Sequence, residues 1–304
     1  MTSFDFVGFG ALNMDKLFKV NRIAHAEEES FIETHSEACG GSAANATVGL
    51  ARLGCKVGFI GKVGCDREGD MLFSDFCKES VDTDGIIRAK RDKSGSVMGF
   101  VDKKGARALY INSGVNDNIA FDEINVEYVS QARFLHLTSF VGEKSFQTQK
   151  KLIETLPSTV KVSFDPGALY ARKDFAQLEP IIKQAYVMMP NSIELELITG
   201  KNDYCRGADA LIEKGVKIVA VKLGSEGCYV TNGRERRRID AFKVKVVDTT
   251  GAGDAFCAGF LYGLLNNKGL HECGRIGNFV ASKCVMKMGA RAGLPYAKDL
   301  ELLG

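Results

Sequence analysis

Residues 246–260, VVDTTGAGDAFCAGF, carry the most structural information in this chain of 304 residues. An apolar run at 244–247, which we expect to form a strand, precedes Asp248, two threonines and the segment Gly251-Ala252-Gly253-Asp254, after which an apolar helical pattern begins. A strand that ends in a glycine-rich turn and opens a helix presents unpaired backbone N–H groups at the positive end of the helix dipole. The pattern indicates an anion site, and an ordinary glycine-capped corner fits it equally well.

Asp254 is the unusual residue of this segment, because a carboxylate repels an anion that the neighbouring amides would attract. An acid at this place is useful if it takes the proton from an alcohol that attacks phosphorus. Two other nucleotide motifs fail here: Phe256 occupies the third glycine position of GxGxxG, and Gly61-Lys62 lacks the remaining residues of a P-loop. The HRD and DFG motifs of protein kinases are also missing.

Composition excludes several classes of partner and location. Forty basic and 38 acidic residues leave a formal charge of +2, so no global field favours nucleic acid or an anionic membrane. The basic run at 234–238 follows an Asn-Gly turn and is interpreted as a solvated hairpin. No apolar run approaches the roughly 18 residues of a membrane span. The nine scattered cysteines suggest reduced thiols, and the N-terminus lacks a secretory pattern. We expect a cytoplasmic protein with no nucleic-acid or membrane partner.

Strand-like and helix-like segments alternate along most of the chain. Short buried-strand patterns are predicted at 6–9, 57–60, 134–137, 160–164, 186–189 and 218–221, and amphipathic helices at 42–53, 70–79, 145–156, 176–183 and 207–214. This alternation is typical of an α/β fold with a doubly wound, mainly parallel sheet and helices on both faces.

Two segments, 13–37 and 94–114, do not fit the alternation. The second resembles paired strands around an Asp102-Lys103-Lys104-Gly105 turn. We expect both segments to form a small β lid outside the main core. Because the sequence has no internal repeat and no proline-rich linker, residues 1–304 are predicted to form a single domain with the lid as an insertion.

Further motifs follow one another in a recognisable order. They are GFGALNMD at 8–15, CGGSAANATVGLARLG at 39–54, PNSIELELITG at 190–200, VKLGSEG at 221–227 and the segment quoted first. Together these motifs resemble the ribokinase family, the PfkB-type carbohydrate kinases, over nearly the whole chain. The resemblance implies a ribokinase-like fold and an ATP-dependent small-molecule kinase, a phosphotransferase with an alcohol group as acceptor.

The resemblance also implies roles for individual residues. Asp254 would be the catalytic base, and the amides of Gly251, Ala252 and Gly253 would form the anion hole. Asp15 would hold two acceptor hydroxyls, with Asn13, Gly41 and Asn45 beside it. The nucleotide would be bordered by Asn191, Lys222, Gly224, Ser225, Gly227, Asn278 and Ala281. Glu194 would organise Mg²⁺ through water, and Asp248 resembles part of a monovalent-cation (K⁺) site.

The sequence departs from the ribokinase pattern at several positions. Gly293 stands where a serine completes the potassium site, Ser42 stands where ribokinases have lysine, and Thr138 or Ser139 stands where they have glutamate. We therefore predict transfer of the ATP γ-phosphate to a ribose- or fructose-like sugar, without specifying ribose. A nucleoside kinase on the same scaffold is the alternative enzyme, and a non-catalytic sugar or nucleotide sensor is the alternative from another class.

Apolar residues in the predicted lid strands, such as Val97, Phe100, Leu109 and Ile111, cannot all be buried on a sheet that stands outside the core. Exposed apolar patches usually mark interfaces. We expect a homodimer in which lid packs on lid, as in many ribokinase relatives.

Overall fold

Continuous apolar runs form the centre of a nine-stranded sheet in the computed structural model, which describes residues 3–104 and 106–303. The strand order is β13-β12-β11-β10-β9-β8-β1-β4-β5, parallel from β5 to β11 and antiparallel for β12 and β13. All eight residues of β4 are buried, as expected for a strand covered on both faces. The strands are β1 Phe4–Phe9, β4 Val57–Gly64, β5 Ile86–Ala89, β8 Ala132–Leu137, β9 Lys161–Phe164, β10 Ala185–Met188, β11 Ile218–Lys222, β12 Cys228–Thr231 and β13 Arg236–Ile239.

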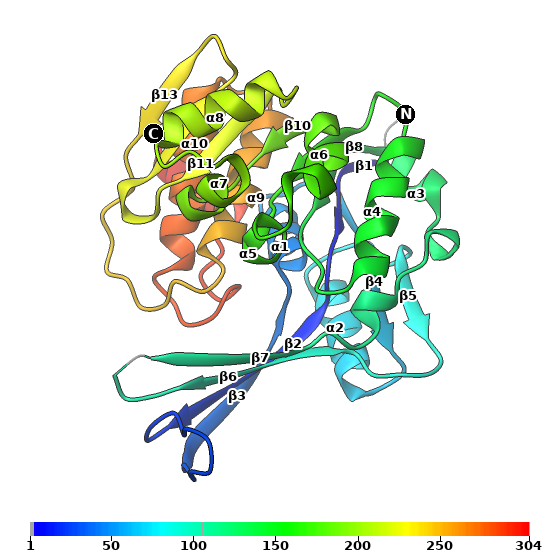
Figure 1. Ribbon diagram of the computed structural model, residues 1–304, viewed down its shortest axis with the longest axis vertical. Coiled ribbons are helices and arrows are strands. Elements are labelled where there is room, and N and C mark those ends of the chain that lie inside the picture. Colours follow the sequence, from blue (N-terminus) through cyan, green and yellow to red (C-terminus); the bar gives the residue numbers. More distant parts are fainter. Residues whose placement is uncertain (1–2, 105, 304) are drawn as a thin grey trace.

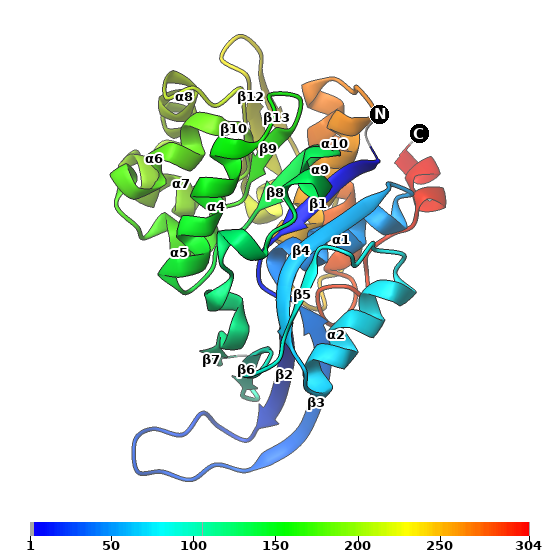
Figure 2. The ribbon, with the colours of Figure 1, turned by 90° about the vertical axis from the view of Figure 1, so that its right-hand side faces the viewer.

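Helices cover both faces of this sheet, which confirms the predicted doubly wound α/β class (Figures 1 and 2). The α-helices are α1 Ser42–Arg52, α2 Arg67–Lys78, α3 Val126–Ser130, α4 Glu143–Thr155, α5 Gly167–Ala171, α6 Phe175–Gln184, α7 Ser192–Thr199, α8 Tyr204–Glu213, α9 Ala252–Leu265 and α10 Leu270–Cys284. Short 3₁₀ turns lie at Gly114–Asn118, Phe121–Glu123, Gly224–Glu226 and Ala297–Leu303.

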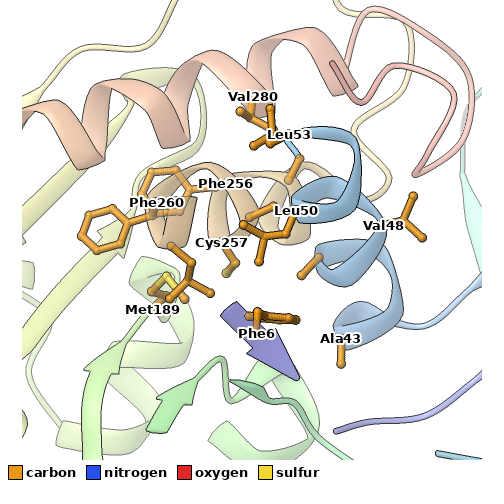
Figure 3. Close-up of a cluster of buried hydrophobic side chains, with 14 of the residues drawn as sticks. Phe6, Ala43, Val48, Leu50, Leu53, Met189, Phe256, Cys257, Phe260 and Val280 are labelled. Carbon is orange, nitrogen blue, oxygen red and sulfur yellow. The ribbon is translucent and has the colours of Figure 1, made fainter. Parts of the chain in front are cut away.

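The two faces of the sheet carry separate hydrophobic clusters. Phe6 of β1 belongs to the cluster of α1, α2, α9 and α10, whereas its neighbour Val7 belongs to the cluster of α3 to α8, because successive side chains of a strand point to opposite faces. Figure 3 shows buried side chains of the first cluster, which come from the sheet (Phe6), from α1 (Leu50), from α9 (Phe256) and from α10 (Val280). This packing fixes α1 and α9 side by side, so that their N-termini lie near one another.

The lid is a separate four-stranded sheet in the order β3-β2-β6-β7, which projects below the main sheet in Figure 1. Its strands are β2 Asn13–Val20, β3 Ile32–Gly40, β6 Gly95–Val101 and β7 Arg107–Asn112. β6 and β7 pair antiparallel, as predicted, although Gly105 of the expected turn lies outside the described residues. The organisation of the chain as one domain stays a prediction.

One predicted strand is wrong. Residues 244–247 form no strand, and Val246 and Val247 are 56% and 51% exposed. β13 ends at Ile239 on the edge of the sheet, after which the chain crosses toward α10, where the Val247 N–H donates to the Val285 carbonyl. Apolar composition alone therefore predicted a strand where no neighbouring strand is available for pairing.

The other predicted elements are present, with ends that differ by a few residues. For example, α2 begins at Arg67 rather than Asp70, because Asp66 caps the helix by accepting a hydrogen bond from the Gly69 N–H at 2.9 Å. Within the described part of the chain, no helix has the length and apolar character that crossing a bilayer requires.

Candidate active site

A cavity of about 830 Å³ lies between the lid and the main sheet. Asp15 on β2 contributes the lid side, and Asn45 on α1 and Asp254 on α9 contribute the opposite side. All the residues predicted for catalysis and acceptor binding line this one cavity: Asn13, Asp15, Gly41, Asn45, Gly251, Ala252, Gly253 and Asp254. Parallel α/β sheets bind ligands at such edges, where the strands end and helices begin.

The N-terminus of α9 has a backbone shape that requires glycine. Gly251 is the N-cap of the helix with a φ of 77°, in the left-handed region. A Cβ at Gly251 would lie 2.5 Å from the Cβ of Ala290, so a side chain is excluded by space as well as by conformation. The Ala252 N–H donates to the Thr249 carbonyl at 3.2 Å, whereas first-turn amides such as that of Gly253 have no partner one turn earlier in the helix. The corner is suited to binding an anion.

Asp254 lies in the first turn of α9, where it accepts a hydrogen bond from the Asn45 side-chain amide at 2.8 Å. Burial raises the pKa of Asp254 to about 7. The Asn45 hydrogen bond opposes that rise, Asp165 adds to it, and the positive charges of Lys222 and Arg291 oppose it. A carboxyl with a pKa near neutrality can accept a proton and release it again at physiological pH, which is the property of a general base.

Asp15 faces the same cavity from β2. It packs so closely on Gly40 that a Cβ there would lie 2.1 Å from its Oδ2 atom. Burial raises the pKa of Asp15 to about 6, and the positive charge of Arg291 opposes this rise. The neighbouring Asn13 accepts a hydrogen bond from the Asn116 side chain at 2.9 Å. The lid thus presents a carboxylate and an oriented amide to whatever occupies the cavity.

A second polar cluster, which contains Lys222 and Asp165, lies next to the N-terminus of α9. The Lys222 Nζ atom is 2.7 Å from Asp165 Oδ2 and lies 3.4 Å from the place that a Cβ would take at Gly253. Burial alone would lower the pKa of Lys222, but the nearby Asp165 carboxylate and the other acidic groups hold it above its usual range. Lys222 therefore carries a permanent positive charge beside the glycine amides.

Glu194 belongs to this cluster as well. It is buried and forms a capping box with Asn191 at the start of α7, with both hydrogen bonds at 2.8 Å. Burial raises the pKa of Glu194, Lys222 opposes that rise, and Asp165 adds to it. The other oxygen of Asp165, Oδ1, is buried and has no hydrogen-bond partner among the described residues.

These carboxylates fit Mg²⁺ held mainly by water and substrate. Among the described residues no group of three or more His, Cys, Asp and Glu side chains could hold a metal ion. Mg²⁺ in phosphoryl-transfer sites usually keeps several waters and takes one or two carboxylates plus phosphate oxygens. Asp165, with its unpartnered buried oxygen, and Glu194 provide a donor set of that size.

The remaining residues predicted to contact the nucleotide lie outside the cavity. Gly224, Ser225 and Gly227 form the tight turn between β11 and β12, in which both glycines have positive φ. Asn278 of α10 donates to the carbonyls of Ile239 and Asp240 at 3.1 and 3.0 Å. Ala281 is half-buried one turn further along α10. The Asn278 amide therefore anchors the chain after β13, and its contact with a nucleotide stays a prediction.

Asp248 organises the loop that precedes α9. Its carboxylate accepts hydrogen bonds from the Thr250 N–H and hydroxyl at 3.0 and 2.7 Å and from the Gly289 N–H at 2.9 Å. A Cβ at Gly293 would lie 2.5 Å from the carbonyl oxygens of Lys283 and Cys284. The backbone therefore has no room for a serine at Gly293, and the resemblance of Asp248 to part of a potassium site stays an expectation from the sequence.

Two charged residues of this region had not been singled out from the sequence. Asp165 directly follows β9, and this position at the carboxyl end of a parallel strand was a usable signal. Arg291 lies in a loop after α10, and its Nε atom donates to Asn45 Oδ1 at 2.8 Å. Nothing local in the sequence indicates that contact, because 246 positions separate the two residues.

Comparison with known proteins defines the class of enzyme. A model of the pfkB family carbohydrate kinases matches residues 5–297. The chain is 49% identical to an uncharacterized sugar kinase of Archaeoglobus fulgidus over 255 residues, which covers 83% of this chain and all of the relative. The protein is thus a phosphotransferase that acts on sugar hydroxyl groups.

The chain belongs to the PfkB family of carbohydrate kinases, which confirms the resemblance found in its motifs. The crystal structure of ribokinase from Thermotoga maritima superposes with a TM-score of 0.89 at 28% identity, over 98% of both chains. Ribokinase from Arabidopsis thaliana, solved with ribose and ATP, superposes with a TM-score of 0.87 at 24% identity, over 99% of this chain and 98% of the other.

Proposed function

We propose that this sugar kinase transfers the γ-phosphate of ATP to a hydroxymethyl group of a ribose- or fructose-like sugar, with Asp254 as the general base. The observation that carries the proposal is the position of Asp254: a carboxyl with a pKa of about 7 beside the glycine amides of α9, in the cavity that Asp15 faces. The reaction needs a site for the phosphate anion and a site for the alcohol. In this proposal the glycine amides of α9 form the first site, Asp15 belongs to the second, and Asp254 lies between them.

In this mechanism the acceptor hydroxyl gives its proton to Asp254 as its oxygen attacks the γ-phosphorus. The bond from the γ-phosphorus to the bridging oxygen of the β-phosphate breaks, and ADP leaves with that oxygen. The amides of Gly251 to Gly253 and the ammonium of Lys222 offset the negative charge on the transferring phosphoryl group. Mg²⁺, when bound near Glu194 and Asp165, would neutralise charge on the phosphates. Asp15 accepts hydrogen bonds from two acceptor hydroxyls and so orients the alcohol toward Asp254.

The nucleotide is proposed to extend from the α9 terminus toward the Gly224–Glu226 turn, with Asn191 and Ser225 along its path. Lys222 supports this direction, because it is the last residue of β11, shortly before that turn, and its Nζ atom lies close to Gly253 of α9. The proposal of a cytoplasmic location is supported by the cysteines, all nine of which are free thiols, as is usual in a reducing compartment.

We further propose the homodimer through the lid. On β7, Leu109 and Ile111 are 60% and 51% exposed although they also line the cavity. Exposed apolar side chains of this size on one strand usually mark an interface. A second copy that covered them would also close the open side of the acceptor site.

A nucleoside kinase remains the second candidate, and one observation favours it. The lid side of the cavity carries the apolar side chains of Leu17, Val97 and Ile111, which suit the face of a base better than a sugar hydroxyl. A non-catalytic sensor is less well supported, because it gains nothing from a carboxyl tuned to neutral pH beside phosphates.

The test is ADP formation from ATP and Mg²⁺ in the presence of a panel of pentoses, hexoses and nucleosides. Acceptor-dependent ADP formation with a sugar supports the proposal, and a strong preference for nucleosides selects the second candidate. If no alcohol in the panel increases ADP formation above that without acceptor, the proposed transfer is wrong.

A further inference from the structure

Arg291 contacts the active-site residue Asn45 without lining the cavity itself. Its side chain is only 10% exposed and lies among α1, α2 and the loop after α10. The Nε atom donates to Asn45 Oδ1 at 2.8 Å, the Nη1 atom pairs with Asp75, and the guanidinium lies 5.7 Å from the centre of the Phe76 ring. The Arg291 carbonyl accepts a hydrogen bond from Arg52 at 2.6 Å, so the residue is held at both its backbone and its side chain.

This contact fixes which way the Asn45 amide points. An arginine side chain has only N–H donors, so the atom of Asn45 that faces it must be the oxygen. The NH₂ group of the same amide must then face Asp254, whose Oδ2 atom lies 2.8 Å away. Asn45 is buried although it lines the cavity, and both polar atoms of its amide are engaged in these two contacts. Asp254 therefore receives an N–H donor, which stabilises its ionised form.

We propose, on the basis of the function proposed above, that Arg291 is a positioning residue: held by Asp75, it orients the Asn45 amide as the hydrogen-bond donor to the base Asp254. Arg291 does not line the cavity, so it acts through Asn45 rather than on the substrate. Without it, the amide is free to turn its oxygen toward Asp254, an arrangement that only the protonated acid satisfies.

Other charged and titratable groups act on Asp254 as well. Asp165, after β9, raises its pKa, and Lys222, at the end of β11, lowers it. The Cys257 thiol lies on α9 itself, and burial raises its pKa well above the usual value. Removal of Arg291 changes none of these groups directly, but it removes one positive charge and the orienting contact. Both changes favour the protonated acid, so the pKa of Asp254 is expected to rise.

The test compares Arg291→Gln with Arg88→Gln as a matched control. Arg88 also pairs with an acidic residue of α2, Asp70, and lies 5.3 Å from the ring centre of Phe73, but it is exposed and does not contact Asn45. Asp254 is titrated directly by ¹³C NMR of aspartate carboxyl carbons, with the Asp254→Asn spectrum as the assignment. This measurement needs no acceptor.

Arg291→Gln should move the Asp254 midpoint upward by about one pH unit, because the lost charge and the lost hydrogen bond both favour the protonated acid and together have an effect of at least that order. The midpoint in Arg88→Gln should stay that of the parent protein. In kinetics, kcat/KM of Arg291→Gln should fall about tenfold near pH 6.5 and recover above roughly pH 9, because alkaline pH restores the carboxylate. A purely structural defect would lower activity equally at every pH.

An unchanged midpoint in folded Arg291→Gln would overturn the inference. If that variant does not fold, Asp75→Asn takes its place, since it leaves the arginine but removes its ionic partner. It should shift the midpoint in the same direction by a smaller amount, and no shift would equally overturn the inference. An inactive parent protein would contradict the proposed function, while the NMR titration would still test the contact.

Discussion

Asp254→Asn should make the folded protein more stable at alkaline pH and leave it unchanged in acid. Burial raises the pKa of Asp254 from its ordinary 3.8 to about 7. An acid whose pKa is higher in the folded than in the unfolded state destabilises the fold as pH rises between those two values. Asparagine stays neutral at every pH, so the fold of the variant does not lose stability in this way as the pH rises.

The magnitude follows from the size of the pKa change. Each pKa unit corresponds to about 1.4 kcal/mol, so ionising Asp254 in the folded state costs roughly 4 kcal/mol at pH 8 and above. For 304 residues this corresponds to about 6 °C in melting temperature. Melting temperatures of both proteins, measured by calorimetry from pH 4 to pH 9, should coincide near pH 4 and diverge through pH 7. A difference that stayed constant with pH, or a less stable variant at pH 8, would refute the placement of Asp254 in a desolvated site.

Three further outcomes are expected. Asp15→Ala should raise the KM of the acceptor strongly, while the KM of ATP in the same steady-state assay changes little; the reverse pattern would exchange the two sites. Gly251→Ala should lower the free energy of unfolding by about 1–3 kcal/mol and weaken ATP binding, because of its φ of 77° and the closeness of Ala290, and normal values of both would contradict the described corner. Leu109→Glu should reduce the light-scattering mass from twice the 33.0 kDa chain mass toward the mass of one chain and weaken acceptor binding; a parent protein of one chain mass would exclude the dimer.

Local patterns in the sequence predicted where one part of the candidate site lies. The glycines before Asp254 predicted a helix N-terminus, and the structure places α9 there, with Gly251 as its N-cap. The family resemblance implied one acceptor site with Asp15 and Asn45, and both residues line the cavity with Asp254, while their roles stay predictions. The start of α9 could be predicted because it depends on a short segment whose place at a helix end is set locally.

Long-range contacts escaped prediction. No periodicity indicates that Arg291 contacts Asn45, or that Lys222 pairs with Asp165, because both contacts exist only after the sheet and its helices have packed. The wrong strand at 244–247 has a related cause, since a strand needs a partner and a sequence does not show whether the sheet edge is free. The two hydrogen bonds from the Asn278 amide to backbone carbonyls were also not visible in the sequence, and the contact of Asn278 with a nucleotide stays a prediction.

The most direct test of the central claim, that Asp254 is the base of a sugar kinase, is a comparison of single-turnover phosphoryl transfer in the parent protein and in Asp254→Asn. With a sugar acceptor, ATP and Mg²⁺ at saturation, we expect the transfer rate of the variant to fall by about 10² to 10⁴, as is typical for loss of a general base. ATP affinity, measured by calorimetry, should remain close to that of the parent, because the amides of α9 are unchanged. Transfer at nearly the parent rate by the folded variant would contradict the account.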